Sequence, residues 1–137
     1  MTRFRTSPSR CVAAGATALT VLLAGCGGTS DATDLSPAAT DGRGIMRRSG
    51  CGSCHGSDGG GGVGPAFVDL FGTDVPLDDG TSVTADRAYL TESILEPAAK
   101  IVDGYTLPMP KTNLSNAEID SIIAYIEALG TTGTTTG

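Results

Sequence analysis

Two cysteines three positions apart are followed directly by a histidine in the stretch Cys51-Gly52-Ser53-Cys54-His55. This C-x-x-C-H spacing is typical of covalent haem attachment, in which each thiol adds to one vinyl group and forms a thioether. The histidine then lies where its imidazole becomes an axial iron ligand. A redox-active cysteine pair and a zinc-binding pair are the alternative interpretations. We predict one covalently bound haem c, attached through Cys51 and Cys54 and ligated by His55.

The second axial ligand must come from another residue type, because His55 is the only histidine in the chain. A single histidine excludes an iron held by two imidazoles, a Cys2His2 zinc finger and a catalytic pair that needs a second imidazole. The sixth iron position is therefore open or filled by another donor. Met109 lies 54 residues after His55, between Pro108 and Pro110. Prolines restrict φ and stiffen the segment, so we predict Met109 as the second axial ligand.

Two helical segments are expected to position this site. Ser115 and Glu118 form a capping box, and apolar residues then recur at helical spacing up to Gly130, which predicts a final helix. A shorter helix over Asp41–Arg48 leads into the cysteine motif. Glycine lowers helix propensity but permits close approach of another backbone. We therefore expect the segment from Gly42 to cross the final helix tightly, with Tyr125 near the contact.

Shorter elements are expected between these two helices. Residues 66–71 predict one or two helical turns, and Asp79-Gly80 between short apolar alternations predicts a small β-hairpin at about 75–83. A third helix is expected to start at an N-cap on Thr84 and to end at Leu95, before a proline. The predicted fold class is therefore all-α with a possible hairpin, in one domain over residues 41–130.

The amino-terminal 25 residues are typical of an export signal, with basic residues followed by an uncharged apolar run. That run is shorter than the ~20 residues that a membrane span requires. The sequence Leu23-Ala24-Gly25-Cys26 resembles the lipobox of bacterial lipoproteins, which implies a diacylglycerol on Cys26. The alternative is an ordinary cleavage site with Cys26 as a stray thiol. We expect a signal peptide at 1–25, a lipidated cysteine and flexible linker at 26–40, and a disordered tail at 131–137.

The formal net charge of the chain limits the classes of molecule that it can bind. Loss of the signal peptide leaves six basic and fifteen acidic residues, so the formal charge changes from −6 to −9. Nucleic acid is then a poor partner, because its phosphates are neutralised by lysine and arginine. We expect an exported protein that its lipid anchors on the periplasmic or outer face of a bacterial membrane.

Several short motifs occur in order between residues 41 and 130. They are Gly42, Cys51 to His55, Gly64-Pro65, Tyr89-Leu90, Glu92 to Pro97, Gly104-Tyr105, Met109-Pro110 and Tyr125-Ile126. These motifs resemble class I cytochrome c and, more narrowly, the cytochrome c domain attached to subunit II of some haem–copper oxidases. The resemblance implies four to five short helices around one haem, with the first and last helices crossing. It also implies that the carbonyl of Pro65 orients His55.

These observations predict an electron-transfer protein rather than an enzyme, and no residue is assigned as catalytic. The expected function is to carry single electrons between respiratory partners, such as a dehydrogenase and a terminal oxidase. One alternative is an electron-accepting haem subunit of an exported dehydrogenase or reductase. Another is a haem-based redox or gas sensor, which requires a sixth iron position that Met109 leaves easily or never fills.

Overall fold

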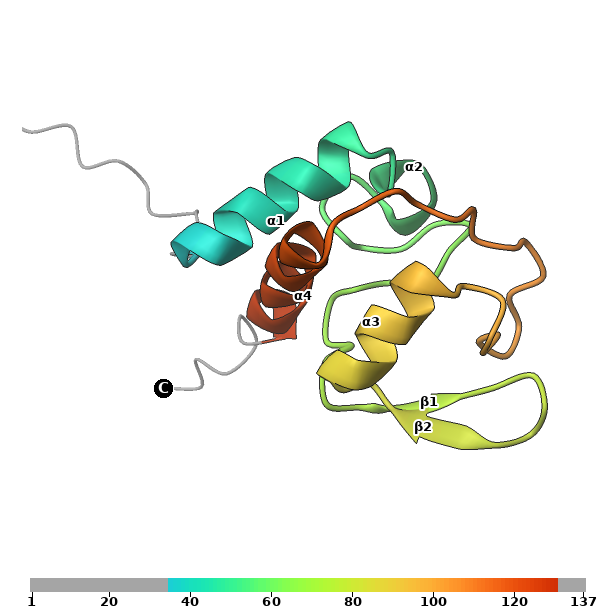
Figure 1. Cartoon of the computed structure of the whole chain (residues 1–137). Coiled ribbons are helices and arrows are strands. Elements are labelled where there is room, and N and C mark those ends of the chain that lie inside the picture. The colour runs from blue at the N-terminus through green and yellow to red at the C-terminus, as the bar shows by residue number, and fades with distance from the viewer. Residues whose placement is uncertain (1–34, 131–137) are drawn as a thin grey trace, which may run out of the picture.

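A computed structural model of the chain describes residues 35–130. The predicted signal peptide, Cys26, the linker up to residue 34 and the tail at 131–137 lie outside the described residues. In chain order the elements are α1 (Pro37–Arg48), α2 (Gly52–His55), β1 (Asp74–Pro76), β2 (Ser82–Thr84), α3 (Arg87–Leu95) and α4 (Asn116–Gly130) (Figure 1). Helices predominate and the two strands form one antiparallel pair, which confirms the mostly helical class and the small hairpin.

Helix α1 begins four residues earlier than the domain start that we predicted at Asp41. Ser36 is its N-cap, and the Ser36 hydroxyl accepts a hydrogen bond from the Ala39 amide at 3.2 Å. Pro37 follows in the first turn, where a missing amide hydrogen costs nothing because that amide has no partner inside the helix. The predicted linker end at residue 40 is therefore wrong, since residues 37–40 belong to α1.

Helices α1 and α4 cross with their backbones in contact and lie side by side in Figure 1. A Cβ atom added to Gly42 would lie only 1.9 Å from the backbone oxygen of Ser121, so no larger residue fits without displacing α4. Ile45 packs into the main apolar core with the isoleucines of α4, while Met46 packs with Tyr125. The predicted pairing of the first and last helices is confirmed.

The start of α4 is the predicted capping box. The Glu118 carboxylate accepts a hydrogen bond from the Ser115 amide at 3.0 Å, and the Ser115 hydroxyl accepts one from the Glu118 amide at 3.4 Å. Each side chain thus satisfies an amide that has no partner inside the helix. The bond from the Ser115 amide is also the first cause that lowers the pKa of Glu118 below its ordinary value.

The N-cap of α3 is Asp86, so the prediction of Thr84 was wrong. The Asp86 carboxylate accepts a hydrogen bond from the Tyr89 amide at 2.8 Å. Thr84 instead ends β2, where it pairs with Asp74 in register and its hydroxyl donates to the Asp74 carboxylate at 3.0 Å. Both residue types cap helices well, and strand pairing decides between them. The helical turns expected at 66–71 are also absent, because that segment runs without regular structure into turns at 68–72.

None of the helices between residues 35 and 130 has the length and apolar character that crossing a membrane needs.

Candidate functional site

The cysteine motif forms one turn of helix. The Cys51 carbonyl accepts hydrogen bonds from the Cys54 amide at 3.2 Å and from the His55 amide at 3.0 Å. The turn therefore brings the two thiols and the imidazole together at one place. Both cysteines are free and half-buried, while His55 is buried at 9% exposure. Burial raises the pKa of the Cys51 thiol above its ordinary value, because a thiolate loses solvation there.

The His55 imidazole is held by the carbonyl that the sequence predicted. Its Nδ1 atom lies 2.8 Å from the Pro65 carbonyl oxygen. A carbonyl oxygen only accepts hydrogen bonds, so Nδ1 must carry the proton and donate it. In the neutral ring, Nε2 is then unprotonated and has a lone pair available for a metal ion.

A glycine-rich loop folds closely over this turn. The Gly61 amide donates to the His55 carbonyl at 2.8 Å, and the Gly64 amide donates to the Cys54 carbonyl at 2.9 Å. A Cβ atom on Gly62 would lie 2.7 Å from the Cys54 oxygen, closer than side-chain carbons approach. Glycine is therefore required at this close approach. The loop brings Pro65 back to the imidazole ten residues after it.

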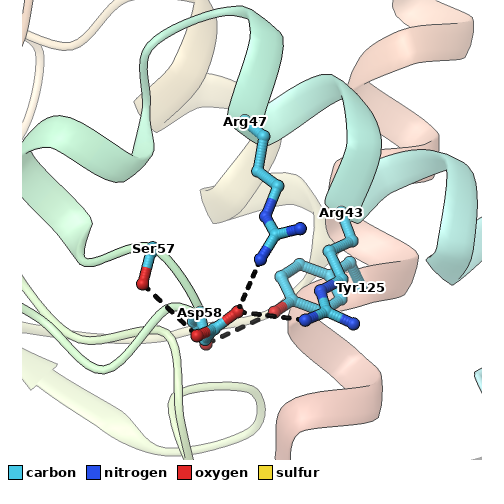
Figure 2. Close-up of polar contacts among 5 residues, drawn as sticks. All are labelled: Arg43, Arg47, Ser57, Asp58 and Tyr125. Atoms are coloured by element: carbon cyan, nitrogen blue, oxygen red, sulfur yellow. Dashed lines mark hydrogen bonds and ion pairs between the residues drawn. The ribbon is translucent and has the colours of Figure 1, made fainter. Parts of the chain in front are cut away.

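Asp58 ties this loop to α1 and α4 (Figure 2). Its carboxylate accepts hydrogen bonds from Arg43 at 3.1 Å and from Arg47 at 3.2 Å, and its backbone oxygen accepts one from the Tyr125 hydroxyl at 3.3 Å. The hydrogen bond from Arg43, followed by that from Ser57, lowers the pKa of Asp58. Asp58 was not among the residues predicted from the sequence, because only the fold brings its partners together.

Phe67 is a second residue that the sequence analysis missed. Its ring stacks on the His55 imidazole, with 4.4 Å between the ring centroids and 22° between the planes. Its position two residues after Pro65 was the available signal, since an aromatic side chain there is near in the chain to the carbonyl that contacts the imidazole.

A cavity of about 350 Å³ opens beside the imidazole, within the range of roughly 300–1,000 Å³ that small-molecule sites occupy. Cys51, His55, Pro65 and Met109 all line it. Its apolar walls include Val75, Leu90, Ile94, Ile122 and Ile126. A smaller hollow of about 110 Å³ is lined by both cysteines, His55 and Met109. The fold thus brings together the residues predicted at the site, while Cys26 lies outside the described part.

These walls fit a haem group. The lining is mostly apolar, as a flat macrocycle requires, and it includes His55 and Met109, whose side chains carry an imidazole and a thioether sulfur. The hydroxyls of Ser93 and Thr112, both on the cavity lining, are buried without a hydrogen-bond partner among the described residues. Buried hydroxyls normally have partners, so these two are free to bond a polar group in the cavity.

The family model described as cytochrome c matches residues 39–130. The match runs from the first turn of α1 to the last residue of α4 and includes Cys51, Cys54, His55, Pro65 and Met109. No curated protein matches the chain.

Proposed function

The chain belongs to the cytochrome c family, and we propose that it is a membrane-anchored carrier of single electrons between respiratory partners. Membership of the family makes haem c its covalently bound cofactor and electron transfer, rather than catalysis, its general function. One observation carries the carrier assignment: His55, oriented by Pro65, and Met109 line the same cavity. The protein can therefore supply both axial ligands itself.

Each residue of the motif has its own role in this proposal. The thiols of Cys51 and Cys54 would form the two thioether bonds to haem, and Nε2 of His55 and the Met109 sulfur would ligate its iron. Haem supplies the one-electron redox chemistry when it is bound. With both side chains bound, the iron would have no position left for a substrate. Ligation by histidine and methionine also raises the reduction potential, which suits a respiratory carrier.

The proposal that the protein is anchored to a membrane rests on its amino-terminal sequence. A diacylglycerol on Cys26, with a further acyl chain on the new amino terminus, would hold the protein stably at a membrane surface, where one chain alone binds only marginally. The domain would then exchange electrons with partners at the same surface, such as a dehydrogenase and a terminal oxidase. This arrangement requires the protein to be exported.

A spectroelectrochemical titration of the purified holoprotein tests the carrier assignment. We expect a single one-electron transition and a low-spin spectrum of histidine–methionine ligation in both redox states. Tight binding of carbon monoxide to the native ferrous protein would contradict the proposal and favour a gas sensor. Co-purification with a catalytic subunit from solubilised membranes would instead indicate a fixed subunit of a larger oxidoreductase.

Fractionation of cells that produce Cys26→Ala tests the anchor. We expect the wild-type protein in the membrane fraction and the variant in the soluble exported fraction. A variant that remains with the membrane would contradict lipid anchoring through Cys26.

A further inference from the structure

The orientation of the His55 imidazole has two separate constraints. The Pro65 oxygen fixes the position of Nδ1 at 2.8 Å. This single hydrogen bond still leaves the ring free to tilt about the axis from Nδ1 to the Pro65 oxygen. The Phe67 ring removes this freedom, because it lies against the imidazole face at 4.4 Å between centroids and 22° between planes. A flat neighbour at this distance allows only a nearly parallel imidazole plane.

Phe67 is itself held in place from several sides. Its amide donates a hydrogen bond to the Gly59 carbonyl at 2.7 Å. A Cβ atom on Gly59 would lie 3.2 Å from the Phe67 Cβ and 2.8 Å from a methyl carbon of Leu129, so glycine lets the loop, Phe67 and α4 meet here. The Phe67 side chain packs against both apolar clusters of the core. The phenyl ring therefore cannot turn away from the imidazole without disturbing the core.

Gly64 lies against the same Nδ1 edge of the imidazole that the Pro65 oxygen contacts. A Cβ atom on Gly64 would lie 3.0 Å from Cε1 and 3.1 Å from Nδ1 of His55. The Gly64 backbone therefore lies so close to this ring edge that a side chain at position 64 would force the imidazole or the loop to shift. With Gly64 and the Pro65 oxygen at the Nδ1 edge and Phe67 against one face, the imidazole has one defined plane.

We propose that Phe67 is a positioning residue that sets the rotation of the His55 imidazole about the bond from Nε2 to the haem iron. This inference rests on the proposed role of His55 as an axial ligand. Neighbours of a ligating histidine fix its ring orientation and tune the metal. The plane of the imidazole selects which iron orbitals it overlaps. A change of plane therefore changes the magnetic anisotropy of the oxidised iron, which a purely structural packing role would leave unchanged.

The test compares oxidised holoprotein variants by electron paramagnetic resonance and by the NMR shifts of the haem methyl groups. Phe67→Leu removes the flat face but keeps an apolar side chain, Phe67→Tyr keeps the face, and Phe71→Leu is the matched control. Phe71 is 37% exposed and is not part of the cavity lining. We expect shifted principal g values and a changed order or spread of methyl shifts in Phe67→Leu alone. A folded Phe67→Leu holoprotein whose spectra superimpose on the wild type overturns the proposal.

A measurement on the wild-type protein covers the case in which Phe67→Leu does not fold. In the reduced, diamagnetic holoprotein we expect nuclear Overhauser contacts between the Phe67 ring protons and the His55 imidazole protons, with ring-current shifts on the latter. The absence of these contacts overturns the proposal. Different results contradict the proposed function and the proposed role of Phe67. A wild-type protein without a low-spin histidine–methionine spectrum contradicts the proposed function. A low-spin wild type with unchanged Phe67→Leu spectra contradicts only the role of Phe67.

Discussion

A methyl group on Gly42 would lie 1.9 Å from the backbone oxygen of Ser121, so α1 and α4 meet without any side chain between them. This contact joins the two ends of the described domain. The helix that leads into the cysteine motif is thereby fixed against the helix whose Ile122 and Ile126 line the cavity. Close crossing of these helices therefore sets the distance between the haem attachment turn and one wall of the haem site.

The first prediction concerns this crossing. Gly42→Ala should destabilise the holoprotein by about 2 kcal/mol or more. The free-energy cost of moving α1 and α4 apart to avoid the backbone clash exceeds the gain from the better helix propensity of alanine. Gly44→Ala is the matched control on the same helix, since its Cβ would meet nothing closer than an Arg48 nitrogen at 3.5 Å. That variant should be more stable than wild type by up to about 1 kcal/mol. Urea unfolding of both variants checks this; equal stability of the two would contradict the crossing.

The second prediction is a pH dependence at Asp58. Its pKa is lowered below the ordinary 3.8, first by the hydrogen bond from Arg43. The folded state therefore favours the carboxylate, and this stabilisation is fully present above about pH 4 and is lost as the pH falls through the lowered pKa. Asp58→Asn should unfold at lower urea concentration than wild type at pH 7, by a small margin because the pair is exposed.

The difference between Asp58→Asn and wild type should narrow as the pH falls below the ordinary pKa of 3.8. Asp103→Asn is the control, because the Asp103 carboxylate makes no ion pair among the described residues. A difference for Asp58→Asn that stays constant from pH 7 to pH 2 would show that the carboxylate charge is not its cause.

The third prediction concerns the axial ligand. Met109→Ala should keep covalent haem but lose the histidine–methionine spectrum, and its reduction potential should fall because the thioether ligand is gone. Met46→Leu is the control, since Met46 is fully buried against Tyr125 and Ala39. Volume-conserving exchanges in a core cost less than about 1.5 kcal/mol, so this variant should keep both spectrum and potential. An unchanged spectrum in Met109→Ala would exclude Met109 as the ligand.

The fourth prediction concerns haem removal. The cavity of about 350 Å³ lies among core residues from β1, α3 and α4, so without haem their side chains lose contacts on one side. A Cys51→Ala/Cys54→Ala chain produced without haem should lack near-ultraviolet circular dichroism and unfold without a cooperative transition. Ser53→Ala, an exposed change between the two cysteines, should keep haem and fold normally. Well-dispersed, native-like NMR spectra of the haem-free chain would refute this dependence.

Structural features that depend only on residues close together in the chain were predictable from the sequence. The motif of Cys51, Cys54 and His55 forms within one helical turn, and the capping box of Ser115 and Glu118 forms across three residues. The hairpin follows from its Asp-Gly turn for the same reason. The first helix start was also within reach, because Ser36-Pro37 is a standard N-cap signature. The composition of residues 27–40 instead predicted a flexible linker up to residue 40.

Contacts between distant residues depended on the tertiary structure. Whether Thr84 or Asp86 caps α3 was decided by the pairing of Thr84 with Asp74 across the hairpin. The Tyr125 hydroxyl reaches the Asp58 oxygen across 67 residues of chain. No local pattern encodes such a contact, because its free energy depends on how every intervening segment packs. The sequence by itself therefore determined the chemistry of the Cys51–His55 motif and the role expected of Pro65, and only the fold decided that the Phe67 ring lies against the imidazole.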